Sequence, residues 1–175
     1  MALLLTFVLL AACSAGHSGR TTGDALDTQG AQSSGTVGNT HAQVGQTWYF
    51  AFPLPRNVSD RSIQITRVRV VDPPKGMKVV GYAAYNRNDT DGLPLLALKG
   101  EADTPDFAHL KNYATAPVTV KAKRESDIFF QARIQIVLPP RAPIRYCQFE
   151  YQQGDTKYTQ TLDCEMELKV GSPLG

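Results

Sequence analysis

Hydrophobic and polar residues alternate along the central part of residues 128–138. Every even position of this run is apolar, whereas Gln131, Arg133 and Gln135 are polar. Successive side chains of a β-strand point to opposite faces of a sheet, so a period of two identifies a strand with one buried face and one solvated face. The pattern predicts a strand whose even positions face a core and whose odd positions face water.

The chain after residue 43 consists of short β-type runs separated by Pro, Gly and Asp. No window has a helical period, although residues 103–113 could hold one short helical turn. Regularly spaced short strands are typical of a sandwich or barrel. We therefore expect an all-β fold, a single immunoglobulin-like β-sandwich of about seven to eight strands over residues 44–175. The strands are expected at residues 47–52, 62–71, 77–85, 95–98 and 128–138, with an edge strand at 118–121 and two more closing the chain.

The alternation changes phase within residues 62–71. Ile63 and Ile65 share one parity, whereas Val68 and Val70 share the other. A slip of one residue moves every following side chain to the opposite face. The slip predicts a β-bulge near Thr66 in preference to a strand that changes sheets.

Aromatic residues gather in the first expected strand. Trp48, Phe50 and Phe52 share one parity and are expected to pack in the core, because large aromatic side chains dominate core packing. Tyr49 has the opposite parity and is expected to be exposed. An exposed aromatic platform for carbohydrate is the alternative interpretation of this set.

Cys147 and Cys164 lie on the two strands that close the chain. If residues 154–157 form the loop between these strands, the two cysteines lie directly opposite each other, and the apolar residues of both strands share one face. We expect a structural disulfide, which would persist in an oxidising compartment. A metal site would need further ligands, a redox pair usually has Cys-x-x-Cys spacing, and free thiols do not suit an oxidising surface.

Residues 2–12 form an uncharged apolar run, shorter than the roughly 20 residues that span a membrane. Such a run fits the apolar region of a signal peptide. It ends in Leu10-Ala11-Ala12-Cys13, which resembles the lipobox of bacterial lipoproteins. The resemblance implies that residues 1–12 are a lipoprotein signal peptide. It also implies that a lipid on Cys13 anchors the exported chain to the outer face of the cell membrane.

The apolar run lacks the positive charge that usually precedes it in a signal peptide. Signal peptides usually begin with a positive residue, yet no Lys or Arg precedes Arg20, so we expect the true start codon to lie upstream of Met1. The alternative is a soluble protein in which the apolar run packs as a buried strand.

Residues 13–43 are rich in Gly, Ser, Thr, Ala and Gln, with Leu26 and Val37 as the only large apolar residues. Such a composition buries too little apolar surface to offset the chain entropy that folding removes. We therefore expect a lipid-anchored flexible linker over residues 13–43. As a coil of about 30 residues, its ends would lie on the order of 30 Å apart.

The charge of the chain is nearly balanced, with 18 basic and 16 acidic residues and a net charge of +2. This balance argues against a nucleic-acid binder, which would carry a clustered basic surface. Basic residues gather at residues 121–124, where they could contact anionic lipid headgroups or a wall polymer. A solvated strand end is the simpler interpretation.

Residues with catalytic or metal-binding chemistry are few. The chain has no Gly-x-Ser-x-Gly motif, and His109 is the only histidine after residue 43. Asp103, Asp106 and His109 are weak candidates for a divalent metal site, with a surface histidine beside two carboxylates as the simpler interpretation. Residues 86–92 resemble a calcium loop but lack its first and twelfth ligands, and we expect a turn with Gly92 at positive φ. No catalytic residue and no cofactor is predicted.

With the lipobox, the polar linker, the β-pattern and the cysteine hairpin together, the chain resembles small uncharacterised secreted lipoproteins of actinobacteria. The resemblance depends on residues 10–13 and on Lys157-Tyr158-Thr159-Gln160-Thr161-Leu162-Asp163-Cys164. It implies an envelope location and no catalysis, and it supplies no ligand.

Two functions are compatible with these features. The first is a non-enzymatic envelope module that binds another envelope protein. The second is a small-ligand or metal-binding lipoprotein that serves a transporter or envelope enzyme. The second would need a pocket, which we expect between the sandwich and residues 86–113, the longest stretch without a clear strand pattern.

Overall fold

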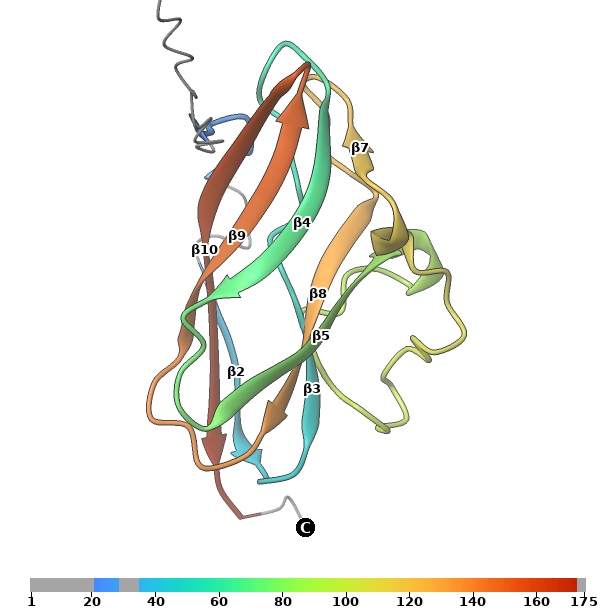
Figure 1. The fold of residues 1–175 in the computed structure, drawn as a ribbon. Helices are drawn as coiled ribbons and strands as arrows, with labels where there is room; N and C mark the ends of the chain where they lie inside the picture. Colours follow the sequence, from blue (N-terminus) through green and yellow to red (C-terminus); the bar gives the residue numbers. More distant parts are fainter. Residues whose placement is uncertain (1–20, 29–34, 173–175) are drawn as a thin grey trace, which may run out of the picture.

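The computed structural model describes residues 21–28 and 35–172. Within them the chain forms ten strands and two 3-10 helices. The strands make two sheets that pack face to face (Figure 1). The predicted all-β sandwich is confirmed, with ten strands in place of seven or eight.

The first sheet has six strands and the second has four. In the first sheet the order is β1 (Thr21–Thr22), β10 (Thr156–Val170), β9 (Ile144–Gln153), β4 (Ile63–Val71) and β7 (Val118–Val120), and β2 (Thr36–Ala42) also pairs with β10. In the second sheet the order is β5 (Met77–Asn86), β8 (Ile128–Ile136), β3 (Thr47–Ala51) and β6 (Leu96–Leu98). The 3-10 helices are η1 (Arg87–Asp89) and η2 (Tyr113–Thr115).

The strand order follows the immunoglobulin pattern. Strands β3, β8 and β5 lie side by side as strands B, E and D do in that fold, and β4, β9 and β10 lie side by side as C, F and G. The expected edge strand, β7, lies at the edge of the first sheet. The sequence expectation of an immunoglobulin-like arrangement is therefore confirmed at the level of strand order.

Local features of the strands agree with the sequence pattern. The pairing of β4 with β9 shifts register between Ile65 and Arg67, which confirms the predicted bulge. Trp48, Phe50 and Phe52 are at most 4% exposed and lie in the core between the sheets. Parity along each strand thus correctly identified the face that packs inward.

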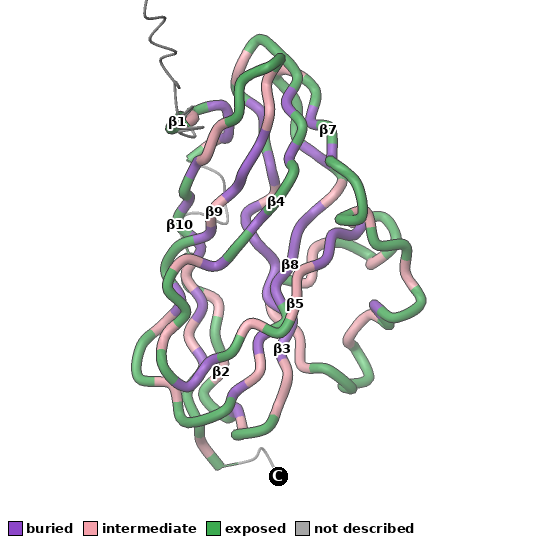
Figure 2. The backbone as a smooth tube through the Cα atoms, in the orientation of Figure 1, coloured by how far each residue is buried: buried purple, intermediate pink, exposed green. Residues whose placement is uncertain are grey.

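Part of the second sheet is buried on both faces, which the sequence analysis did not predict. Buried and exposed residues alternate along β4, whereas most of β8 is buried (Figure 2). Gln131 is 0% exposed and Tyr49 only 9%, although both were expected to face water. The segment between β5 and β8 folds over this outer face and excludes water from it. Leu138 was expected in the core but is 63% exposed, because β8 ends at Ile136.

The expected flexible linker over residues 13–43 is wrong for its described parts. Strands β1 and β2 both pair in parallel with β10, and Leu26 and Ala42 are 1% and 0% exposed. Small polar residues suit this role because backbone groups, rather than large side chains, make the contacts with β10. The folded domain therefore begins before residue 44. Residues 13–20 and 29–34 lie outside the described part.

The segment 21–28 is held by specific hydrogen bonds. The Ala25 N–H donates to the Tyr151 hydroxyl at 3.0 Å, and the Leu26 N–H donates to Gln160 Oε1 at 2.9 Å. Gln160 Nε2 in turn donates to the Leu26 carbonyl at 2.6 Å. Burial raises the pKa of Tyr151, partly offset by the Ala25 hydrogen bond, so the phenol stays neutral at physiological pH.

The two cysteines are bonded, but their register differs from the expected one. Their Cα atoms lie 5.8 Å apart, and the predicted pair is confirmed. The hairpin turn consists of Gly154 and Asp155 alone, so Cys147 lies opposite Leu162 and not opposite Cys164. Glycine is favoured at the first position of such a turn, and Gly154 has φ 60°. A shift of two residues keeps every side chain on its predicted face.

Candidate functional site

The longest excursion from the sandwich is the covering loop, which we define as residues 87–117. It begins after β5, supplies β6 at the edge of the second sheet, and returns through η2 to β7 in the first sheet. In Figure 1 it lies beside the second sheet. Positive φ angles at Asp91, Gly92 and Gly100 let the chain reverse direction within it, and the predicted positive φ at Gly92 is confirmed at 115°.

The inner side of the covering loop forms a second, smaller core. The ring centroid of Phe107 lies 4.6 Å from that of Tyr49 and 4.9 Å from that of Tyr85. The Tyr85 hydroxyl donates a hydrogen bond to the Phe107 carbonyl at 3.2 Å. Burial, reinforced by the neighbouring Tyr49, raises the pKa of Tyr85. This core comprises Tyr49, Ala51, Ala83, Tyr85, Phe107 and Phe129, with Leu54, Leu93, Ala97 and Leu110 partly buried against it.

Gln131 lies beneath the covering loop on the outer face of β8. Its neighbours across the ladder are Ala51 on β3 and Ala83 on β5, both small. Among the described residues, neither its amide oxygen nor its amide nitrogen has a hydrogen-bond partner. A buried amide left unpaired costs about 1–3 kcal/mol. Gln131 is therefore a polar group that the fold does not use for stability.

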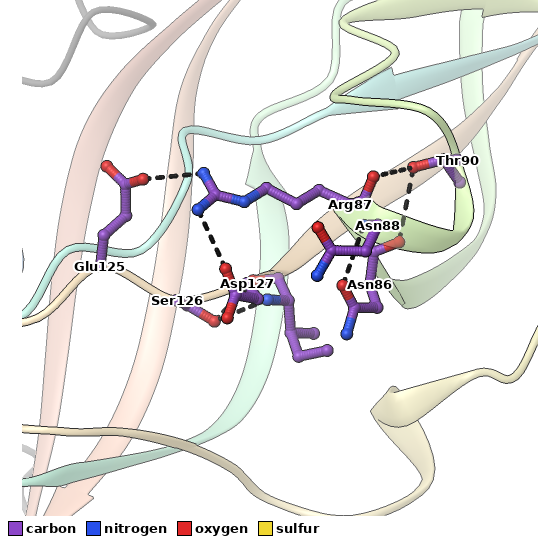
Figure 3. A network of polar contacts seen from close by, with 8 residues as sticks. Asn86, Arg87, Asn88, Thr90, Glu125, Ser126 and Asp127 are labelled. Carbon is purple, nitrogen blue, oxygen red and sulfur yellow. Dashed lines mark hydrogen bonds and ion pairs between the residues drawn. The ribbon is translucent and has the colours of Figure 1, made fainter.

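The start of the covering loop is fixed to the start of β8 by a polar network (Figure 3). The Arg87 guanidinium contacts Glu125 Oε1 and Asp127 Oδ1, each at 2.9 Å. Asn86 Oδ1 accepts a hydrogen bond from the Asn88 N–H at 2.9 Å and so shapes the first turn. Exposed ion pairs contribute only about 0–1 kcal/mol each, so this network mainly sets geometry.

The three candidate metal ligands are only partly brought together. Asp106 Oδ2 lies 2.7 Å from His109 Nδ1, with side chains 70% and 84% exposed. Asp103 does not join this pair. Within residues 21–28 and 35–172, no group of three His, Cys, Asp or Glu side chains is close enough to hold a metal ion. The arrangement is a surface hydrogen bond in a turn.

The outer side of the covering loop is acidic. Residues 87–117 carry five carboxylates, Arg87 and two lysines, a net charge of −2, in a chain whose total is +2. All five carboxylates are exposed. They are Asp89, Asp91, Glu101, Asp103 and Asp106, and the lysines are Lys99 and Lys111. The loop therefore carries charge of opposite sign to the rest of the chain.

Described residues also line hollows elsewhere on the surface, including three that differ in volume. An apolar cavity of about 250 Å³ opens between the sheets beside Val37, Phe50 and Leu95. A shallow hollow of about 750 Å³ lies beside β1 and includes Asp24 and Asp27. The third, of about 380 Å³, lies at the opposite end of the sandwich and is lined by Lys75, Gly76, Leu138, Pro139 and Arg141. None of the three linings includes a histidine, and none pairs a nucleophile with a base.

Comparisons with known proteins supply no assignment: no protein-family model, curated protein or solved structure matches this chain. No helix of the described residues is long and apolar enough to cross a membrane. Cys13 and the expected signal peptide lie outside the described residues.

The covering loop is thus the most distinctive candidate, and sequence reasoning identified only part of it. The absence of a strand pattern over residues 86–113 indicated where the loop lies. Asp103, Asp106 and His109 within it were named as candidate metal ligands. Phe107 and Gln131 were missed. A single phenylalanine within the mostly polar residues 99–112 was the available signal for Phe107.

Proposed function

We propose that this protein is a non-enzymatic binding module of the cell envelope, anchored by a lipid on Cys13, whose covering loop binds a basic surface of another envelope protein. The observation that carries this proposal is the division of the loop into a sealed inner side and an exposed acidic outer side. Loops held on a rigid scaffold are common positions for binding residues. The lipobox resemblance at residues 10–13 supports the anchor and the location.

The way the loop is held favours binding to a partner. Phe107 is inserted between two tyrosines, and Arg87 ties the start of the loop to the start of β8. A loop already fixed in position loses less conformational entropy when a partner binds. Its net negative charge would speed encounter with a basic surface and disfavour acidic partners.

Affinity capture from envelope extract of the source organism tests this proposal. The bait is residues 13–175 with Cys13→Ser, and the test variant is Glu101→Gln/Asp103→Asn/Asp106→Asn. We expect one envelope protein to be enriched by the unaltered loop and reduced at least about tenfold by the variant, since complementary charge pairs contribute strongly to association. Capture should also weaken at high salt.

A matched control separates loop contacts from net charge. Asp72→Asn/Asp155→Asn/Asp163→Asn removes the same three negative charges from exposed positions outside the loop. This control should capture the partner as well as the unaltered bait. Equal capture by all three baits, or no enrichment by any, would overturn the proposed role of the loop.

A second candidate function is the binding of a small ligand beneath the covering loop. Gln131 favours it, because its unpaired amide can offer donor and acceptor groups to a ligand and its ladder neighbours, Ala51 and Ala83, both belong to the smaller core. Small-ligand sites are mostly apolar and contain a few such polar groups. Sugars and amino acids have the matching chemistry, and the loop would have to lift to admit them.

Gln131→Met should raise the free energy of unfolding by about 1–3 kcal/mol, because it removes an unpaired buried amide while keeping side-chain length. Gln135→Met, at a half-exposed position of the same strand, should change stability by less than about 0.5 kcal/mol. Urea unfolding measures both.

A ligand in a thermal-shift screen that stabilises the wild type but not Gln131→Met would support the second function. A loss of stability in Gln131→Met would count against it.

A further inference from the structure

Five basic residues gather at one end of the sandwich, which we call the basic tip: residues 57–62, 121–125 and 153–157. The three loops are held together by hydrogen bonds. The Asn57 N–H donates to the Arg124 carbonyl at 2.8 Å, and Gln153 Nε2 donates to Ser59 Oγ at 2.8 Å. The basic residues, all exposed, are Arg61, Lys121, Lys123, Arg124 and Lys157.

Most of the carboxylates at this tip are already paired. Lys123 Nζ lies 3.0 Å from Asp60 Oδ1, and Glu125 forms an ion pair with the Arg87 guanidinium. Asp155 is the third carboxylate. No ion pair joins the other four basic residues to a described carboxylate; they are Arg61, Lys121, Arg124 and Lys157. The tip therefore presents four available cations and one available carboxylate.

The direction of β1 brings the chain in from this same end. β1 runs parallel to β10, with Thr21 opposite Tyr158, so Thr21 lies at the end of β1 that is nearer to the β9–β10 turn. β1 is held in place, since the Gly23 N–H donates to the Thr159 carbonyl at 2.9 Å. Figure 2 shows β1 beside the upper part of the sandwich, and the opposite end of β10 lies at the bottom.

The docking of β1 shortens the connection between anchor and domain. The eight peptide steps from Cys13 to Thr21 span at most about 29 Å when extended. A lipid on Cys13 would therefore bring the basic tip, and not the far end of the sandwich, toward the membrane. The acidic covering loop contacts the tip where Arg87 pairs with Glu125, and its middle part lies beside the second sheet (Figure 1).

We propose that the basic tip docks on the anionic lipid headgroups of the membrane that holds the anchor, so that this end of the sandwich faces the membrane. This inference depends on the lipid anchor of the proposed function. Two features select a membrane surface as the occupant: the short chain from Cys13 ends at this tip, and the tip has an excess of cations. Repulsion between the headgroups and the acidic loop favours the same orientation.

Vesicle sedimentation tests the tip without the anchor. The protein is residues 13–175 with Cys13→Ser, and the vesicles are phosphatidylcholine with or without phosphatidylglycerol. Each basic residue near an anionic surface strengthens binding roughly fivefold. We expect binding only to the anionic vesicles, and Arg61→Gln/Lys121→Gln/Arg124→Gln/Lys157→Gln should weaken it at least about twentyfold, allowing for incomplete contact.

The control variant removes four exposed cations from the far part of the sandwich: Lys75→Gln/Lys78→Gln/Arg141→Gln/Arg145→Gln. It has the same net charge as the tip variant and should bind within about threefold of the unaltered protein. Equal weakening by both variants would overturn the proposal, because binding would follow net charge alone. So would a lack of preference for anionic vesicles. Tip-dependent binding to soluble polyphosphate but not to vesicles would also overturn it.

The anchor is measured separately. The mass of the N-terminal peptide from the envelope fraction of cells that express the full chain shows whether Cys13 carries a diacylglycerol group. A lipidated Cys13 together with no tip-dependent vesicle binding would refute the docking and leave the proposed anchor intact. An unmodified Cys13 would refute the anchor, and with it the membrane-facing orientation.

Discussion

Replacing both cysteines of the C-terminal hairpin, as Cys147→Ala/Cys164→Ala, should lower the free energy of unfolding by about 3 kcal/mol. The disulfide joins residues 17 apart in sequence, and breaking it restores the corresponding chain entropy to the unfolded state. Both residues are also in the core, at 0% and 3% exposure, so the variant loses packing as well. Urea unfolding at equilibrium measures the difference.

The effect should be specific to this pair of cysteines. Cys13→Ala should leave the free energy of unfolding unchanged. The single variant Cys147→Ala should account for most of the loss in the double variant, because the loss of either cysteine removes the disulfide. A loss below about 1 kcal/mol in the double variant would mean that the hairpin restrains the unfolded chain little. The structural role assigned to the disulfide would then be wrong.

The cysteine pair also illustrates what local patterns can predict. A turn of two residues replaced the expected four, so the predicted register was wrong by two. The pair was still correct, because side chains on a strand repeat every two residues and the shift preserved the faces. The bulge between Ile65 and Arg67 was likewise visible as a change of phase. Features encoded within one strand or one hairpin were therefore predictable.

Burial imposed by distant segments was not predictable in the same way. Gln131 and Tyr49 have the parity of a solvated face, and the covering loop, with Phe107 packed against Tyr49, excludes water from that face. No periodicity in the chain records that contact. The polar segment before residue 44 was misjudged for a related reason, since its pairing with β10 uses backbone groups that hydrophobicity does not register. Leu26 and Val37 were the signals of burial there.

Leu26→Ala should lower the free energy of unfolding by about 2–4 kcal/mol, although Leu26 lies in a segment with the composition of a linker. Its side chain is 1% exposed and belongs to the main core. Truncation would leave a cavity between the sheets and loosen the two hydrogen bonds that Gln160 makes with the Leu26 backbone. Equilibrium urea unfolding, followed by the fluorescence of Trp48, measures the loss.

Two comparisons make this test decisive for the length of the tether. Leu138→Ala, at a position 63% exposed, should change stability by less than about 0.5 kcal/mol. Gly23→Ala should destabilise the protein, because a Cβ there would overlap the Tyr151 hydroxyl, whereas Gly35 has open space around it and Gly35→Ala should be tolerated. If residues 21–28 were a free tether, Leu26→Ala and Gly23→Ala would be as mild as their controls. The anchor would then lie a full linker away from the domain, and the basic tip would have no fixed relation to the membrane.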